Sequence, residues 1–586
     1  MPERCTASSR LPEESAGGLV FDAELWLRRI LIVLACLWMV CCVLLPVAQL
    51  LWKSFLSPAG EFAGLANYRF YFRTPALSSS LINSLYVATL TTAVSTTLGL
   101  IFAYALTRTC IPLKGFFLGV AMTPIFAPTL LNGIALVYLF GKKGLISQGF
   151  FGHIPGIPVE LYGLFGIAFA EILYTFPQAV LILCVALRMT DARLYEASQS
   201  LGATPFRSFL TITLPGIKFG LISTFFVCFI LAFTDFGAPK VVGGHFNVLA
   251  TDIYKQVIGQ QNFVMGAVVS SILLVPTIIA FVVDRTCQRR QFSALTARSV
   301  PLVPRPSKTR DSLAFILCAV VAIGILGFYG TALFASLVKI WPYNLSLGLG
   351  HYDFSRTGGG GIGSLFNSIR MSLYSASLGT AVAFGSAYLI EKSRGMRALR
   401  QVSYMLSLVP LALPGMVIGL SYIFFFNTPS FSVLGLNIPN PFNLLYGTMG
   451  ILVLSNLVHF YTVSFLTATT ALKQLDKEFE TVSESMGVPF FKTFARVTVP
   501  VCLPAILEVW IYYFVNSMAT VSAVIFLYNA DLTLASVAVA NMDDAGDTAP
   551  AAAMAMLIVG VNILARCGYS LVNRLVQAKT QAWAVR

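Results

Sequence analysis

Charged residues are scarce in this sequence. Asp, Glu, Lys and Arg make up 11% of the 586 residues and 57% are hydrophobic, whereas soluble globular proteins carry about 25% charge. The composition therefore excludes a soluble enzyme and predicts a membrane protein whose apolar segments cross the lipid. Basic loops on the cytoplasmic side explain the formal net charge of +14 better than nucleic-acid binding does.

Sequence motifs for metal, disulfide or nucleotide chemistry are also missing. None of the 11 cysteines belongs to a Cys-x-x-Cys pair and the four histidines lie far apart, so no local motif predicts a disulfide framework, a metal site or a cofactor. Gly141-Lys142 lacks the upstream glycine and the hydroxyl residue of a phosphate-binding loop. The chain therefore has no ATPase motif of its own, and no catalytic pair indicates a membrane-embedded enzyme.

Twelve stretches are apolar and long enough to cross about 30 Å of hydrocarbon. They lie near residues 30–52, 80–107, 116–140, 161–187, 216–236 and 262–283, and near 312–338, 368–390, 402–426, 446–472, 503–528 and 549–572. We therefore expect an all-α membrane protein with about 12 transmembrane helices. The first stretch is too long for a signal peptide and follows a polar segment.

The distribution of basic residues predicts the orientation. With the N-terminus placed in the cytoplasm, the loops on that side hold 29 of the 39 Lys and Arg residues. Because cationic flanks resist translocation, both termini are expected to be cytoplasmic. The predicted parts are a cytoplasmic N-terminal segment (1–29), a first half (30–284), a solvated basic linker (285–311), a second half (312–573) and a cytoplasmic tail (574–586).

The two halves repeat each other at an offset of about 285 residues. Asn83-Ser84 recurs as Asn367-Ser368, Pro128 as Pro414, Gly202 as Gly487 and Pro215 as Pro500. Each half has an even number of spans, so the halves form two parallel six-helix repeats, an arrangement that favours a pathway between them. Shared ancestry without a shared pathway is the alternative.

The most specific motif lies in a cytoplasmic loop after the fourth span of each half. The first loop (190–215) contains Glu196-Ala-Ser-Gln-Ser-Leu-Gly202, then Phe206, Phe209 and Pro215, and the second loop (473–500) contains Glu480, Gly487, Phe491, Phe494 and Pro500. This pattern resembles the EAA loop of ABC importer permeases, which forms the coupling helix that docks on the ATPase. The resemblance implies ATPase docking for these residues, with Phe206 and Phe209 exposed to a partner's groove. A helix lying on lipid headgroups is the alternative.

The second loop departs from the pattern at its glutamate. Aligned on Gly487, Thr481 stands where the first loop has Glu196, and Glu480 lies one residue earlier, about 100° around the helix. We transfer the docking role to both loops and leave open whether Glu480 replaces the missing glutamate.

The resemblance also implies partners. Two docking loops imply two ATP-binding cassette subunits, expected to be identical, and the chain has no soluble domain to capture cargo, which implies a separate periplasmic substrate-binding protein. The chain is then a non-enzymatic transport subunit of a bacterial inner membrane. Its fused layout resembles the iron(III) and 2-aminoethylphosphonate importers, and residues 234–240, 246–262 and 541–547 resemble the 2-aminoethylphosphonate permeases. That phosphonate is the expected cargo, and iron(III) is the alternative.

Polar residues within the spans are expected to mark the pathway, because such groups are costly in lipid. Asp235, Asn516 and Thr520 are the predicted pathway residues. Asp235 has an alternative, pairing with Lys240 or contact with interfacial water. His459 is expected to make a hydrogen bond between helices.

Other acidic residues leave alternatives open. Asp543, Asp544 and Asp547 form either a solvated outer turn or a patch that attracts cations or a binding protein. A secondary transporter, the rival from another class, would need coupling carboxylates within the membrane. Glu171 and Glu508 are the unassigned carboxyls in the spans.

Overall fold

A computed structural model describes residues 15–293, 300, 302–393, 396–433, 436–476 and 478–580. The start of the predicted N-terminal segment, part of the basic linker and the end of the predicted tail lie outside the described residues.

Seven helices are long and apolar enough to cross a membrane without a break. They are Trp26–Ser54, built from α1 (Ser15–Met39), η1 (Val40–Leu44) and α2 (Leu45–Ser54), then α4 (Pro75–Arg108), α8 (Leu164–Arg188), α15 (Phe263–Ser293), α16 (Lys308–Leu337), α17 (Gly363–Lys392) and α27 (Thr548–Thr580). Five bent helix pairs bring the number of possible spans to 12, which agrees with the expected all-α fold.

Hydropathy treats three of the five bent pairs as unbroken stretches, and the other two bend where the predicted stretches 216–236 and 503–528 begin. A bend of 104° joins α5 (Lys114–Ala121) and η2 (Thr123–Phe126) to α6 (Thr129–Phe140), and its counterpart of 110° joins α18 (Arg397–Leu406) and η7 (Val409–Ala412) to α19 (Gly415–Phe426). A bend of 66° joins the segment α10 (Pro205–Ser208), η3 (Phe209–Thr213) and α11 (Leu214–Gly216) to α12 (Lys218–Thr234), and its counterpart of 77° joins the segment α23 (Phe490–Thr493), η9 (Phe494–Thr498) and α24 (Val499–Val501) to α25 (Leu503–Ala519). The fifth bend, of 56°, lies between α20 (Met449–His459) and α21 (Tyr461–Gln474). The two sharpest bends occur at Pro128 and Pro414, because proline cannot continue the helical hydrogen bonding.

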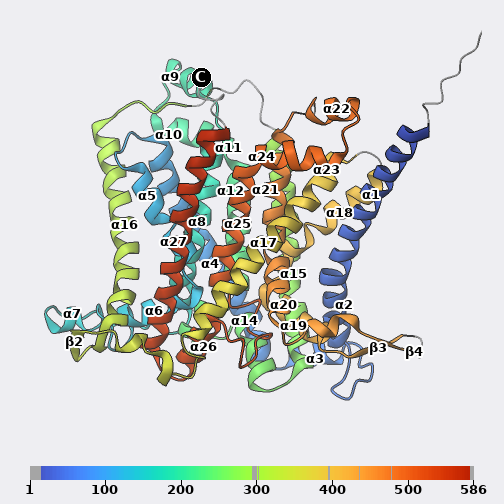
Figure 1. Cartoon of the computed structure of the whole chain (residues 1–586). Helices are drawn as coiled ribbons and strands as arrows, with labels where there is room; N and C mark the ends of the chain where they lie inside the picture. Colours follow the sequence, from blue (N-terminus) through green and yellow to red (C-terminus); the bar gives the residue numbers. More distant parts are fainter. Residues whose placement is uncertain are drawn as a thin grey trace, which may run out of the picture.

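The first span of each half packs against the other half. The span formed by α1 and α2 contacts α17, α18 and α19 of the second half, whereas α16 contacts α4, α5 and α6 of the first. Figure 1 shows α16 beside α5 and α6 on one side of the molecule and α1 beside α18 on the other. The sequence halves are therefore intertwined in space.

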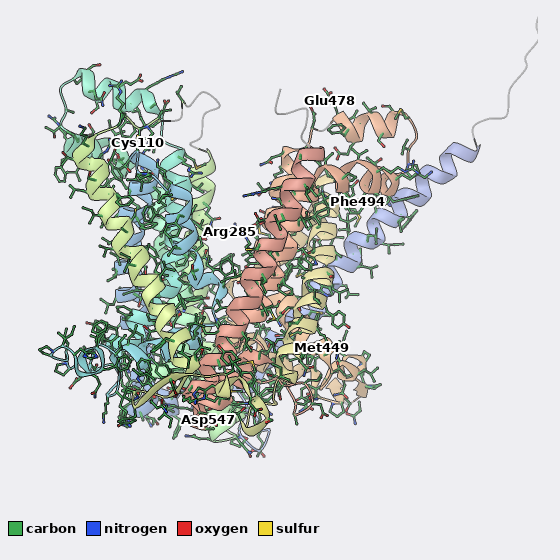
Figure 2. All side chains as sticks on the ribbon, turned by 60° about the vertical axis from the view of Figure 1, so that its left-hand side comes forward. Cys110, Arg285, Met449, Glu478, Phe494 and Asp547 are labelled. Atoms are coloured by element: carbon green, nitrogen blue, oxygen red, sulfur yellow. The ribbon has the colours of Figure 1, made fainter. Side chains whose placement is uncertain are left out.

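The two ends of the molecule carry different elements. Helices α9 (Ala192–Ser200) and α22 (Glu478–Ser485) lie at the same end as the start of α1 and the end of α27 (Figure 1). The opposite end carries two short hairpins (Figure 1), β1 (Val338–Ile340) with β2 (Asn344–Leu347) and β3 (Ser430–Val433) with β4 (Leu436–Pro439). In Figure 2 the two groups of helices stand apart at the α9 and α22 end and come together at the end near Asp547.

The repeated Asn-Ser pair caps the same helix in each half. The Ser84 hydroxyl accepts the first N–H of α14 (Leu249–Tyr254) at 2.8 Å, and the Ser368 hydroxyl accepts the first N–H of α26 (Ala535–Asp544) at 2.8 Å. Both N–H groups lie at helix starts, where no backbone carbonyl is available. This conserved use of one motif shows that the sequence repeat is also a structural repeat.

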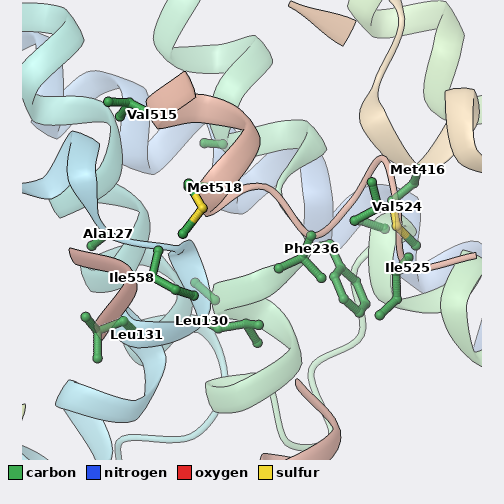
Figure 3. Packing of buried hydrophobic residues seen from close by; sticks show 14 of the residues in the cluster. Ala127, Leu130, Leu131, Phe236, Met416, Val515, Met518, Val524, Ile525 and Ile558 are labelled. Carbon is green, nitrogen blue, oxygen red and sulfur yellow. The ribbon is translucent and has the colours of Figure 1, made fainter. Parts of the chain in front are cut away.

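Buried apolar side chains from both halves meet near the helix breaks. Leu130 and Phe236 of the first half and Met518 and Val524 of the second belong to one buried cluster, and Figure 3 shows them together. This packing joins the halves where the two groups of helices converge.

In each half a glycine lies against a hydroxyl side chain, at the same pair of repeat positions. The glycine and the hydroxyl residue exchange positions between the two halves. A β-carbon on Gly237 would overlap the Thr129 hydroxyl, and one on Gly415 would overlap the Ser522 hydroxyl. Gly415 is the repeat counterpart of Thr129, and Ser522 that of Gly237. The space between these two positions therefore holds one side chain only. In the first half it comes from Thr129, and in the second half from Ser522.

We expect Gly237→Ala to lower the thermal unfolding temperature of the purified protein, because overpacking destabilises by about 1–3 kcal/mol. Adding Thr129→Gly removes the overlapped hydroxyl and should recover part of the loss. Thermal scanning in detergent measures both. Gly385→Ala is the control, since no atom lies within 4 Å of its added carbon, and unchanged stability of Gly237→Ala would contradict the close packing.

Candidate functional site

Both repeated loops begin with a short helix that ends at a glycine. In the first loop, Asp191 caps α9 by accepting the Arg193 N–H at 3.1 Å. Gly202 follows α9 with φ +71°, and Gly487 follows α22 with φ +67°. Left-handed backbone favours glycine, so the two glycines singled out in the sequence end these helices where other residues would be strained.

Three apolar side chains are exposed at matching positions of each loop. These surfaces, called coupling surfaces after the role that the sequence predicts for the loops, consist of Leu194 (56% exposed), Leu201 (87%) and Phe206 (71%) in the first loop, and of Phe479 (49%), Met486 (69%) and Phe491 (52%) in the second. A groove of about 700 Å³ adjoins the second surface and is lined by Phe479, Met486, Lys492 and Arg496, among others. Exposed apolar clusters of this kind mark interaction sites. The sequence analysis missed four of the six residues, although the 285-residue offset relates them.

Phe209 and Phe494 do not belong to the coupling surfaces. Each is half-buried and packs on a tyrosine of its own half, Phe209 on Tyr104 with ring centroids 5.7 Å apart and Phe494 on Tyr388 at 4.6 Å. The expectation that Phe209 is exposed is therefore wrong. The pair instead anchors each loop to a membrane helix, α4 or α17.

The repeated prolines Pro215 and Pro500 follow directly on a local π-helical turn. The turns are η3 and η9, and each ends two residues before its proline. Proline lacks the N–H that regular α-helical bonding requires there. Both prolines are exposed and lie where the loop turns into span α12 or α25.

Glu480 has a partner within its own half. Its carboxylate lies 3.1 Å from Lys392 Nζ, with the two side chains 18% and 8% exposed. The repeat counterparts are Tyr195 and Arg108, and the Arg108 guanidinium lies 5.1 Å from the centre of the Tyr195 ring. Glu480 therefore corresponds to Tyr195 in holding the loop to the membrane helices, whereas Glu196 is exposed.

The described part of the linker contacts the first loop. The Val300 carbonyl accepts the Ala192 N–H at 2.9 Å, and the Asp311 carboxylate accepts the Cys110 N–H at 3.3 Å. The sequence predicted a solvated linker, and the described residues between these two contacts are mostly exposed, with residues 303 and 305–309 all exposed.

The three predicted pathway residues line one pocket between the halves. Asp235, Asn516 and Thr520 surround about 90 Å³ together with Tyr174 and His459. The lining comes from the helix breaks before α6 and α21 and from the ends of α12 and α25. Breaks leave backbone polar groups that are tolerated within a membrane only where protein or a water-filled cavity meets them.

Matching positions of the two repeats line the pocket. Asp235 corresponds to Thr520 and Tyr174 to His459 at the 285-residue offset, and all four line the pocket. His459 was expected to hydrogen-bond between helices, but its buried Nδ1 has no hydrogen-bond partner among the described residues.

Asp235 does not pair with Lys240, the alternative that the sequence left open. One Asp235 oxygen accepts the Ala238 N–H at 3.0 Å. Lys240, on α13 (Gly237–Val242), instead lies 2.5 Å from Asp544 on α26. This ion pair joins the two halves at the hairpin end.

The remaining acidic residues have separate environments. Burial raises the pKa of Asp543 to about 6, although nearby Lys240 lowers it, whereas Asp547 is exposed. Asp544 is exposed as well, so two of the three aspartates lie in solvent and Asp543 is half-buried. Glu508 lies 3.2 Å from Arg566 and also accepts a hydrogen bond from Tyr569.

Known proteins similar to this chain are transport permeases. The ferric transport system permease protein FbpB of Actinobacillus pleuropneumoniae is 28% identical over 82% of this chain and 69% of its own length. The putative ferric transport system permease protein FbpB 1 of Haemophilus influenzae is 29% identical over 77% of this chain and 70% of its own length.

A third relative matches less of the chain. The putative 2-aminoethylphosphonate transport system permease protein PhnU of Salmonella paratyphi A is 27% identical over 45% of this chain and 91% of its own length. The family model for the binding-protein-dependent transport system inner membrane component matches twice, at residues 95–293 and 377–578. The two matches correspond to the two structural repeats, and the chain belongs to this family as a fused double permease of the ABC importer class.

Proposed function

We propose that the two coupling surfaces each receive one copy of an ATP-binding cassette subunit on the cytoplasmic side of the inner membrane. The observation that carries this proposal is the matched exposure of apolar side chains on α9, α22 and the turns that follow, at one end of the molecule. A lipid-surface role explains the match less well, because the same anchoring by Phe209 and Phe494 positions both surfaces. Both termini lie on that cytoplasmic side in this proposal.

ATP binding would draw the two coupling surfaces together. The halves already converge at the hairpin end and stand apart at the loop end (Figure 2). Closure at the loop end therefore rotates the two groups of helices about the place where they meet. This rotation strains the Lys240–Asp544 contact at the opposite end. The halves then open toward the periplasmic binding protein, which delivers the cargo.

The proposed cargo is 2-aminoethylphosphonate. Residues 234–240, 246–262 and 541–547 resemble permeases for that solute, and one relative carries this name. Iron(III) is the second candidate, favoured by two ferric permeases that match both halves.

The double variant Phe206→Ser/Phe491→Ser should lose ATPase binding. Burying a phenylalanine contributes about 1.5–3 kcal/mol, so removing one from each surface should weaken the complex at least tenfold. Titration of the detergent-solubilised permease with its ATPase subunit measures the affinity. Gln199→Ala, an exposed polar position on α9, is the control, and unchanged affinity of the serine variant would contradict docking here.

Glu196 and Glu480 should respond differently to neutralisation. Glu196→Gln should reduce transport-coupled ATP hydrolysis, because Glu196 is exposed on α9. Glu480→Gln should act through Lys392, so Glu480→Gln and Lys392→Met should couple by about 0.5–3 kcal/mol in a stability cycle. Additive effects on thermal unfolding would show that the Glu480–Lys392 contact does not hold the loop.

The partner binding protein should set the cargo. A soluble binding protein can surround a zwitterion with matched polar groups, so we expect calorimetric titration to show tight binding of 2-aminoethylphosphonate and none of inorganic phosphate. Tight binding of ferric iron without a response to the phosphonate would replace the proposed cargo and leave the transporter class intact.

A further inference from the structure

The pocket between the halves has one acidic wall. Glu171 on α8 lies behind Asp235, and its repeat counterpart in the second half is Asn456. Asp235 and Tyr174 on the first wall correspond to Thr520 and His459 on the second. At all three matched positions, the first half supplies an acidic or phenolic group and the second half a neutral amide, hydroxyl or imidazole.

Glu171 lacks the partners that a structural carboxylate would have. Its side chain is fully buried, and no described group donates a hydrogen bond to either carboxyl oxygen. The polar group that it meets is another carboxyl, that of Asp235. Two adjacent carboxyls away from water do not carry two uncompensated charges, because like charges repel, so the pair carries at most one negative charge unless a cation joins it.

Asn456 occupies the same position in the second half with a neutral amide, whose oxygen has no hydrogen-bond partner among the described residues. Its amide nitrogen donates to the Leu452 carbonyl at 3.1 Å and to Met371 Sδ at 3.2 Å. A neutral amide is therefore sufficient for packing at this position, and the fold itself does not require a carboxyl at Glu171.

No described residue that lines the pocket is Lys or Arg, so the lining supplies no fixed cation for the carboxyl pair. The groups near the pair that can titrate are Tyr174, Tyr512 and, across the pocket, His459. An unneutralised charge away from water is unfavourable unless a positive group approaches it. The pocket volume of about 90 Å³ holds only a few water molecules. A cargo would therefore bring only one of its groups at a time to the carboxyl pair.

We propose that Asp235, with the buried Glu171 carboxyl behind it, binds the positively charged group of the cargo as it passes between the halves, while Asn516, Thr520 and His459 on the opposite wall hydrogen-bond the remainder. The positive group is either an ammonium or a metal cation. The inference rests on the proposed function in one respect, that the cargo passes through this pocket.

Uptake into proteoliposomes holding the permease, its ATPase and its binding protein tests the role. In the neutral variant Glu171→Gln/Asp235→Asn we expect uptake to fall at least tenfold, with ATP hydrolysis stimulated by the loaded binding protein kept within twofold. A mirror variant moves both carboxyls to the other wall, through Glu171→Asn, Asn456→Glu, Asp235→Thr and Thr520→Asp. It should recover uptake to within about threefold of the unmodified protein.

Two results would overturn the proposal. One is uptake by the neutral variant within twofold of the unmodified protein. The other is a loss that the mirror variant does not recover, or that ATP hydrolysis shares, because a packing role would produce that pattern.

A second measurement does not depend on transport. Dicyclohexylcarbodiimide reacts with protonated carboxyls in apolar surroundings, and mass spectrometry of the purified complex locates the adduct. We expect labelling at Glu171 or Asp235, slowed severalfold by 2-aminoethylphosphonate or by a ferric salt, whichever is the cargo, but not by ethylphosphonate, which lacks the ammonium. Absence of protection by both, or equal protection by ethylphosphonate, would overturn the proposal.

The two measurements separate the inference from the proposed cargo. If the unmodified complex transports neither candidate, the proposed cargo is wrong, and the labelling result with the two cationic probes still decides the role of the carboxyl pair.

Discussion

Backbone hydrogen bonding within the membrane is the constraint on which this structure depends. Lipid offers no partner to a free N–H or C=O group, so a helix can break at membrane depth only where other protein or a cavity meets the break. Three spans are broken within their predicted length, and the breaks near Pro128 and His459 meet the ends of α12 and α25 around one pocket. The place where the halves join is therefore also the place where polar groups gather.

The coupling loops show how one local arrangement is kept while its chemistry changes. An aromatic pair anchors both loops, Tyr104 with Phe209 and Tyr388 with Phe494. A second contact fixes the short helix, but the first half uses a guanidinium over a ring and the second half an ion pair. The geometry of the loop is preserved, and its residues need not match in charge.

Much of the fold could be predicted from sequence because hydropathy and internal repetition are one-dimensional signals. The 12 stretches and the parallel halves follow from them. The exchange of first spans and the breaks at His459 could not be predicted, because packing partners depend on side-chain shape in three dimensions. The repeat offset matched Asp235 with Thr520, and both residues line one pocket.

Single-residue environments were harder to predict. Phe206 and Phe209 are both apolar and lie three positions apart, yet only Phe206 is exposed, because the π-helical turn that starts at Phe209 directs that side chain toward Tyr104. Glu171 could not be assigned from sequence, since its meaning depends on Asp235, a residue on another helix.

The exchange of first spans has a consequence for biosynthesis. The span Trp26–Ser54 packs against α18 and α19, which lie some 370 residues later in the chain. At about 5–20 residues per second of synthesis, it waits on the order of 20–75 s in the bilayer before these two partners emerge, and until then α15 of the first half is the earlier partner that it can contact. During that interval lipid must cover the face that the finished protein buries. Both groups of helices are therefore complete only when the second half has been inserted.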